Sequence, residues 1–122
     1  MRALLSIKPQ YTKLIFAGYK KFEYRRAIFK KPIERIVVYA SAPISKVIGE
    51  FDVDCIIQGG IDELWNSTNL YSGISKQFFY SYFIGKDQGY AIKIGNTHLY
   101  RTPKNLWQEF GVQPPQSFLY LS

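Results

Sequence analysis

The stretch Gly18-Tyr19-Lys20-Lys21-Phe22-Glu23-Tyr24-Arg25-Arg26 marks a change in the sequence from a helical to a strand pattern. Before it, Pro9 can occupy the first position of a helix and Gly18 can end that helix in the left-handed conformation, so a short helix is predicted from Pro9 to Ala17. After Gly18 the side chains alternate with a period of two, which predicts a strand. The predicted fold therefore builds on a helix that leads directly into a strongly charged strand.

This predicted strand carries charges of both signs on one face. Lys21, Glu23 and Arg25 share that face, and same-face neighbours lie roughly 6.5–7 Å apart. The opposite face carries the other three side chains of the strand: Phe22, Tyr24 and Arg26. Lys20 belongs to the turn, so its ammonium can join the guanidinium of Arg25, which suits a planar partner with two oxygens. The pattern favours an anion site, and the alternative interpretation is a solvated strand face with weak ion pairs.

Length and composition indicate one globular domain that spans residues 1–122. The chain has 122 residues with 47% hydrophobic content, which is enough for a single core without disulfides. We expect no membrane association, because no apolar run approaches the roughly 20 residues of a membrane-spanning helix. The N-terminal segment is too short and too soon interrupted for a secretory signal, so a cytoplasmic location is expected.

The scarcity of cysteine and histidine argues against several chemistries. Cys55 is the only cysteine and lies on the apolar side of an alternating strand, so a buried, inert thiol is expected. His98 is the only histidine, and nothing near it suggests a nucleophile for a serine or cysteine triad. One His and one Cys fall short of a zinc ligand set, so we expect no metal and no cofactor.

The charge balance favours a polyanionic partner. Sixteen Lys and Arg against nine Asp and Glu give a net charge of +7, and ten Tyr and nine Phe are interspersed among them. This combination is typical of nucleic-acid binding, so RNA or a nucleotide is the expected partner. The alternative is a protein partner, for which the loop Asn66 to Gly73 and the C-terminal tail offer candidate surfaces.

The remainder of the chain predicts short strands. Further strands are expected over Ala3 to Lys8, Ile33 to Ala40, Lys46 to Ile57, Gln88 to Ile94 and Thr97 to Arg101. The last two are expected to form a hairpin at Gly95-Asn96, and Gln58-Gly59-Gly60 is interpreted as a turn. Gly49 is expected at a bulge or bend. The acids Glu50, Asp52 and Asp54 indicate a solvated or cross-paired sheet face, with a site role for Glu50 as the alternative.

Short helices are predicted between and after these strands. They are expected over Ile61 to Trp65, over Ile74 to Gly85, and after Thr102-Pro103 with Leu106, Trp107 and Phe110 inward and Gly111 at the end. The basic loop Ala27 to Pro32 offers Lys30 and Lys31 as candidate phosphate contacts. The hydrophobic end of the tail is expected to dock on the body. The elements add up to an α+β fold with a small curled sheet or partly open barrel.

The motif Gly18-x-Lys20-x-x-Glu23-x-Arg25, after a short helix that follows an N-terminal strand, resembles the signature of the ASCH domain, a branch of the PUA-like group. Val47-Ile48-Gly49-Glu50-Phe51 is similar to the central strand of that family. The segment Tyr90-Ala91-Ile92-Lys93-Ile94 is similar to a later strand of the family. The resemblance implies a small PUA-like, partly open β-barrel of about five or six strands with capping short helices. It also implies a cleft between the first helix, the motif strand and the later helix, and an RNA- or nucleotide-related role.

The resemblance also implies two enzymatic alternatives. Relatives that hydrolyse N4-acetylcytidine use a lysine and a threonine of this motif; Lys20 matches the lysine, but Glu23 occupies the threonine position and cannot act as a hydroxyl nucleophile. This amidohydrolase activity is therefore disfavoured. Other relatives are ribonucleases, for which Lys20, Glu23 and Arg25 could act as phosphate clamp, general base and transition-state stabiliser.

Two hypotheses from different classes follow. In the first, the chain is a binding module whose cationic cleft holds phosphate or a base edge while an aromatic ring stacks on an unpaired base. The candidate binding residues are Tyr19, Lys20, Lys21, Glu23, Tyr24, Arg25 and Arg26. In the second, the chain is a hydrolase, either a metal-independent ribonuclease or an enzyme for a modified nucleoside, with Lys20 and Glu23 as catalytic residues.

Overall fold

Six strands form one mixed sheet in the computed structural model, which describes residues 1–121. The strands are β1 (Arg2–Ile7), β2 (Phe22–Arg25), β3 (Arg35–Ala40), β4 (Lys46–Gly60), β5 (Gln88–Lys104) and β6 (Phe118–Leu121). Their order in the sheet is β2-β5-β4-β3-β1-β6, with β1 and β3 parallel and the other neighbours antiparallel. The edge strands β2 and β6 each pair with one neighbour and not with each other, so the sheet stays open. The predicted α+β fold with a partly open sheet is confirmed.

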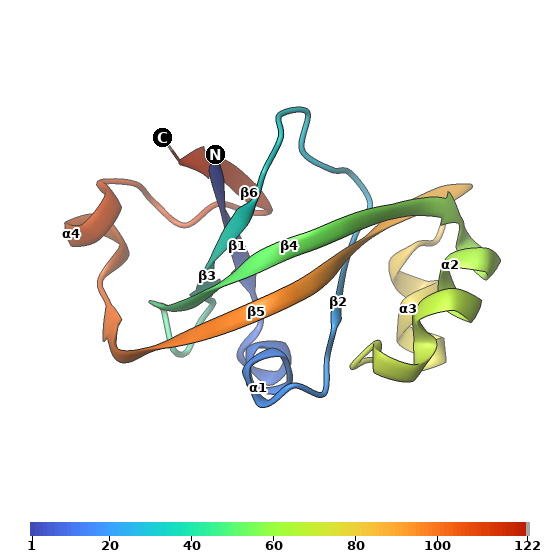
Figure 1. Ribbon diagram of the computed structural model, residues 1–122, viewed down its shortest axis with the longest axis horizontal. Coiled ribbons are helices and arrows are strands. Elements are labelled where there is room, and N and C mark those ends of the chain that lie inside the picture. The colour runs from blue at the N-terminus through green and yellow to red at the C-terminus, as the bar shows by residue number, and fades with distance from the viewer. Residues whose placement is uncertain (122) are drawn as a thin grey trace.

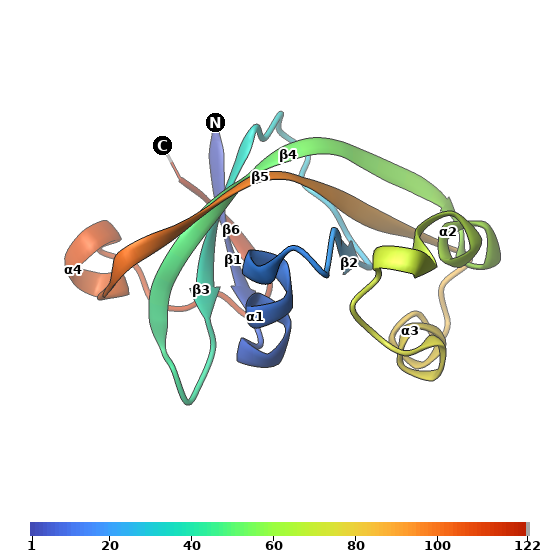
Figure 2. The same ribbon diagram turned by 60° about the horizontal axis from the view of Figure 1, so that its bottom comes forward.

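Short helices lie at the ends of the sheet and in its concave side (Figures 1 and 2). They are α1 (Pro9–Ala17), α2 (Ile61–Thr68), the 3-10 turn η1 (Asn69–Tyr71), α3 (Lys76–Tyr82) and α4 (Leu106–Phe110). The bounds predicted for α1 are confirmed, with Pro9 at its start and Gly18 left-handed at its end. The segment after Trp65, expected to be irregular, instead continues α2 and then forms η1.

The long strands β4 and β5 form a curved ribbon across the whole molecule, with α2 and α3 at one end and α4 at the other (Figure 1). The predicted hairpin at Gly95-Asn96 is wrong, because β5 continues through both residues, which lie in a register shift between the pairs Val53–Ile94 and Phe51–Thr97. The predicted turn at Gln58 to Gly60 is also wrong, since these residues pair with the start of β5. Register shifts along the ribbon let it bend without breaking.

The expected bend at Gly49 is confirmed by a register shift between Val47 and Gly49. A Cβ atom at this position would lie 2.5 Å from the main-chain oxygen of His98 and 2.7 Å from the ring of Phe16. The absence of a side chain therefore lets β5 and α1 approach β4 closely at this point.

The same register shifts explain why Cys55 is exposed and not buried as predicted. Strict alternation from Phe51 would place it inward, but the shifts between Phe51 and Val53 and between Val53 and Cys55 break the period. The predicted helix start at Thr102-Pro103 is also wrong. The helix α4 begins after Asn105, whose side chain accepts a hydrogen bond from the main-chain nitrogen of Gln108 at 3.0 Å. As a result Trp107, expected inward, is 61% exposed.

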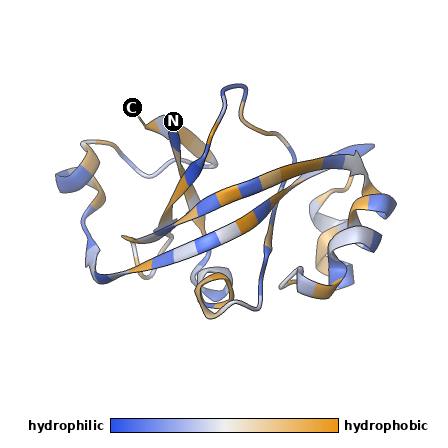
Figure 3. Cartoon of the chain, in the orientation of Figure 1, coloured by the Kyte–Doolittle hydropathy of each residue, from blue (hydrophilic) through white to orange (hydrophobic). Residues whose placement is uncertain are grey.

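Buried hydrophobic side chains form three clusters, of which the first two lie on opposite faces of β1 and β3. The first joins β1, β3 and the middle of the ribbon to α1, and the second lies near α4 and β6. The third packs β2 and the far end of the ribbon against α2 and α3. Hydrophobic and hydrophilic residues alternate along much of the ribbon (Figure 3), which fits strands with one buried face, whereas β3 is buried on both faces from Ile36 to Ala40. The helices α1 and α3 lie on either side of β2 (Figures 1 and 2).

The C-terminal tail docks as expected, because β6 pairs antiparallel with β1 from Phe118 to Leu121. The basic loop is tied to it, since the main-chain nitrogen of Lys30 donates to the Tyr120 hydroxyl at 2.8 Å. Of the helices in residues 1–121, none has the length and apolar character needed to cross a membrane.

Candidate functional site

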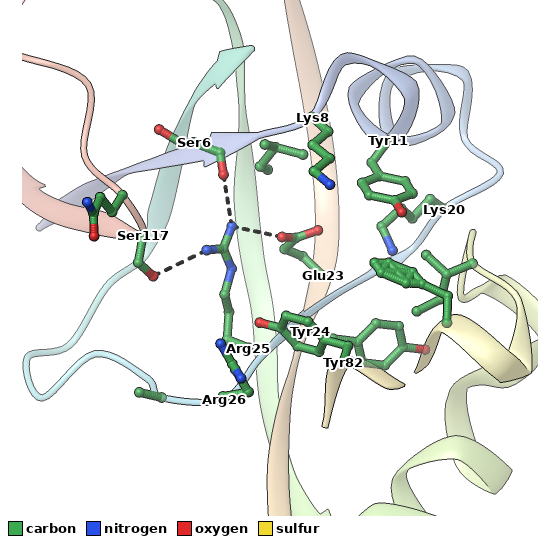
Figure 4. A pocket seen from close by; sticks show the side chains of 15 residues that line it. Ser6, Lys8, Tyr11, Lys20, Glu23, Tyr24, Arg25, Arg26, Tyr82 and Ser117 are labelled. Carbon is green, nitrogen blue, oxygen red and sulfur yellow. Dashed lines mark hydrogen bonds and ion pairs between the residues drawn. The ribbon is translucent and has the colours of Figure 1, made fainter. Parts of the chain in front are cut away.

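A cavity of about 490 Å³ opens between α1, β2, α3 and the tail (Figure 4). Its lining comes from segments that are far apart in the sequence: the end of β1 and the start of α1, the α1–β2 turn and β2, the region of α3, and the residues before β6. The charged and aromatic side chains that line it are Lys8, Tyr11, Lys20, Glu23, Tyr24, Arg25, Arg26, Phe78 and Tyr82.

The turn between α1 and β2 fixes the position of Lys20. Gly18 adopts φ +88°, and its main-chain nitrogen donates to the oxygen of Ile15 at 3.1 Å. The main-chain nitrogens of Tyr19 and Lys20 both donate to the oxygen of Leu14, at 3.0 and 3.1 Å. These bonds satisfy the carbonyl groups of Leu14 and Ile15 in the last turn of the helix and fix the course of the chain into β2.

Lys20 is buried, with 2% of the residue exposed, although its side chain lines the cavity. Its Nζ donates to the main-chain oxygen of Ser72 at 2.5 Å and lies 5.5 and 5.1 Å from the ring centres of Tyr11 and Tyr24. Burial lowers the pKa of Lys20 to about 8; the Glu23 carboxylate opposes this shift and the Arg25 guanidinium adds to it. At neutral pH the site therefore holds a positive charge with little hydration.

Glu23 and Arg25 form an ion pair, with Nη2 of Arg25 2.8 Å from Oε2 of Glu23. The alternation of β2 places both on one face, as the sequence predicts, and both side chains are largely buried. Arg25 also donates through Nη2 to the main-chain oxygen of Ser6 at 3.2 Å and through Nη1 to Oγ of Ser117 at 3.3 Å. Its buried Nε has no hydrogen-bond partner within residues 1–121.

The aromatic wall of the cavity is packed from behind by α2 and α3. The Tyr24 hydroxyl and Oγ1 of Thr68 are 2.8 Å apart, and the Tyr24 ring lies edge-on to Phe79 at 5.1 Å. Burial raises the pKa of both Tyr24 and Tyr82, so both phenols are neutral at physiological pH. The guanidinium of Arg26 lies 5.3 Å over the ring of Tyr82, at the rim.

The structure brings together five of the seven predicted binding residues and leaves two outside. Lys20, Glu23, Tyr24, Arg25 and Arg26 line the cavity. Tyr19 and Lys21 do not, and they lie on the outer surface beside it. Lys21 departs from the expected alternation because β2 begins only at Phe22, and its main-chain nitrogen bonds to the oxygen of Tyr71. A ligand contact stays a prediction for all seven residues.

Sequence reasoning missed several lining residues that other segments contribute. Ser6, Lys8, Tyr82 and Ser117 enter the cavity from β1, the α1 N-terminus, α3 and the tail. Tyr11 was assigned to the apolar stripe of α1, where its ring also stacks on Phe78 at 5.9 Å. The spacing of aromatic residues predicted a packed helix, and no local signal indicated that its rings would border a cationic cavity.

The acidic stripe on β4 is a cross-paired face. Arg35 Nη1 lies 2.7 Å from Oε1 of Glu50, and Nη2 lies 3.1 Å from Oδ1 of Asp52. The Tyr100 hydroxyl donates to Oε2 of Glu50 at 2.7 Å, and the burial of Tyr100 together with this bond raises its pKa. Within residues 1–121 no group of three or more His, Cys, Asp or Glu side chains is arranged to hold a metal ion.

Fold and site together define a small α+β domain with a cationic, aromatic-walled cavity at the opening of a mixed sheet. No protein-family model matches the chain. The chain is 33% identical over 124 residues to an ASCH domain-containing ribonuclease from Zymomonas mobilis, covering 98% of this chain and 83% of that protein. The crystal structure of ASCH from Zymomonas mobilis superposes with a TM-score of 0.92 and 30% identity over 99% of this chain and 87% of that one.

A third similarity concerns a longer protein. The large ribosomal subunit protein uL22 of Ureaplasma parvum is 31% identical over 120 residues, which cover 97% of this chain and 38% of that protein. The chain thus spans well under half of that relative. On the strength of the Zymomonas relative and its structure, this chain belongs to the ASCH domain family.

Proposed function

We propose that this chain binds single-stranded RNA or a nucleotide in the cavity between α1, β2 and α3. The observation that supports the proposal is the composition of the cavity wall, in which four cationic side chains and one carboxylate lie together with three tyrosines and Phe78. Cations attract phosphate groups and aromatic rings stack on unpaired bases, which is how proteins hold single strands. The cavity volume of about 490 Å³ is that of a small-molecule site and suits one nucleotide.

The charged groups suggest distinct roles. Lys8 and Arg26 are exposed and can follow the movement of a phosphate group at the rim. Arg25 is held by three partners and presents a fixed positive charge. Glu23 uses Oε2 in its ion pair while its other carboxylate oxygen points away from Arg25 (Figure 4), where it can accept a hydrogen bond from the amino group of a base.

A second candidate function, RNA cleavage, is favoured by the relative that is named a ribonuclease. In this reaction Glu23 would take the proton of a ribose 2′-hydroxyl, whose oxygen attacks the adjacent phosphorus while the bond to the 5′-oxygen breaks. The Lys20 ammonium would return a proton to the leaving oxygen, and Arg25 would stabilise the charge on the phosphorus oxygens. The products would be a 2′,3′-cyclic phosphate and a free 5′-hydroxyl.

Binding is tested by fluorescence anisotropy with a labelled single-stranded RNA. We expect affinity that falls steeply as salt rises, because phosphate contacts release counterions. Lys20→Ala, Arg25→Ala and the exposed Arg26→Ala should weaken binding, while Arg35→Ala, which removes an arginine on the acidic face of β4, should not. Equal RNA affinities for all variants would show that the cavity is not the RNA-binding site.

Cleavage is tested by incubating wild type and Glu23→Gln with RNA and, separately, with acylated nucleosides. Turnover of RNA by wild type and its loss in Glu23→Gln would support the ribonuclease. If neither protein turns over any of these substrates, the binding proposal stands alone.

A further inference from the structure

Tyr19 presents its ring to solvent from a rigid turn beside the cavity. The residue is 71% exposed, although the main-chain nitrogen of Tyr19 and that of Gly18 are both bonded to α1. A single exposed ring is ordinary on a protein surface and needs no explanation. The surroundings of this ring are what distinguish it.

A second exposed ring and a cation lie next to this turn. The main-chain nitrogen of Lys21 donates to the main-chain oxygen of Tyr71 at 2.9 Å, and the Lys21 ammonium lies 4.6 Å over the Tyr71 ring. Tyr71 is 45% exposed. Within residues 1–121 Lys21 forms no ion pair with a carboxylate, so its charge is available to an anion. We call Tyr19, Lys21 and Tyr71 the outer platform.

The outer platform and the cavity share one wall. Lys20 Nζ donates to the main-chain oxygen of Ser72 on the cavity side, and Lys21 bonds to Tyr71 on the outer side. Two adjacent pairs of residues therefore hold the α1–β2 turn against the η1 segment, which Figures 1 and 2 both show side by side. Tyr19 and Lys21 are the immediate chain neighbours of Lys20, which lines the cavity, so the outer platform adjoins the cavity along the chain.

We propose that a single RNA strand continues from the cavity onto the outer platform, so that the chain prefers a strand of several nucleotides to a mononucleotide. This inference rests on the proposed function and extends it. Tyr19 and Tyr71 stack on bases next to the one in the cavity, and Lys21 contacts a phosphate between them. Stacking tolerates any base, so the outer platform adds affinity and strand length rather than sequence preference.

The test compares two probes by titration calorimetry: uridine 5′-monophosphate and a single-stranded pentauridylate with 2′-O-methyl groups, which prevents cleavage during the measurement. Wild type should bind the pentanucleotide more tightly. Tyr19→Ala/Tyr71→Ala should weaken pentanucleotide binding by roughly tenfold for each ring and leave the mononucleotide affinity within about twofold. Lys21→Gln should reduce the slope of log K against log salt by about 0.7 for the pentanucleotide.

Trp107→Ala is the matched control, because it removes an exposed ring from α4 at the opposite end of the ribbon. The inference is overturned if the double tyrosine variant loses no more affinity than Trp107→Ala, if it loses affinity for both probes equally, or if wild type binds both probes alike. If wild type binds neither probe, or if Arg25→Ala binds both as well as wild type does, the proposed function itself fails and the inference fails with it.

Discussion

The guanidinium of Arg25 lies 3.2 Å from the main-chain oxygen of Ser6 and thereby joins β2, one edge of the sheet, to the end of β1. A second bond from the same guanidinium reaches Ser117, just before the other edge strand, β6. Side-chain hydrogen bonds thus span the opening that main-chain pairing leaves in the sheet. The candidate site occupies this opening, so the groups that hold the two edges together are also the groups that face the cavity.

Removing Arg25 should destabilise the fold as well as weaken binding. Arg25→Gln leaves the buried Glu23 carboxylate without its partner, and such a loss costs about 3–5 kcal/mol in the free energy of unfolding. The double variant Arg25→Gln/Glu23→Gln also removes the unpaired carboxylate, so it should be more stable than Arg25→Gln alone. The free energy of unfolding of each variant is measured by urea denaturation. Strictly additive losses in this double-mutant cycle would show that the pair is not coupled.

Lys20 should make stability depend on pH above neutrality. Its pKa is lowered from 10.5 to about 8, so between these values the unfolded chain binds more protons than the folded protein. The free energy of unfolding of wild type should therefore rise with pH across this window relative to Lys20→Met, by up to about 3 kcal/mol. Taking the difference from Lys20→Met removes the effect of tyrosine ionisation. A difference that stays flat from pH 8 to 10.5 would mean that burial does not perturb this ammonium.

Local patterns predicted α1 and the charged face of β2, and they failed where the long strands β4 and β5 meet. The helix from Pro9 to Ala17 and the shared face of Glu23 and Arg25 depend on capping residues and on a period of two, both of which are local. The continuous path of β5 through Gly95-Asn96 is not local, because it depends on a partner strand some forty residues earlier. A glycine and an asparagine favour a turn only where no partner holds the chain extended.

The rest of the site also depends on contacts between distant segments. Ser117 reaches Arg25 because the tail pairs with β1, and Ser72 reaches Lys20 because η1 follows α2 without a loop. The periodicity of the sequence says which face of an element is buried and not which element covers it. The motif therefore indicated three residues that line the cavity, Lys20, Glu23 and Arg25, while the depth of Lys20 could be known only from the fold.

Cys55 offers a direct check of the bulged register in β4. Because the register shifts turn it outward, its thiol should react with a soluble disulfide reagent in the native protein at nearly the rate found in denaturant. The measurement is the absorbance of the released thiolate under native and unfolding conditions. Protection by several orders of magnitude in the native state would restore the original prediction of a buried thiol.

Gly73 should be essential to the position of Lys20. It adopts φ +69°, and a Cβ atom there would lie 2.6–2.7 Å from the Lys20 side chain, so Gly73→Ala must displace either the lysine or the segment that covers it. Gly85→Ala is the matched control, since Gly85 has φ +80° but nothing within 4 Å of an added Cβ. The left-handed backbone alone should lower the free energy of unfolding of both variants by roughly 1–2 kcal/mol. Because of the added clash with Lys20, Gly73→Ala should lose more stability than Gly85→Ala and should also bind RNA less tightly. Equal stability and equal RNA affinity in the two variants would show that Lys20 has room to move without consequence for the cavity.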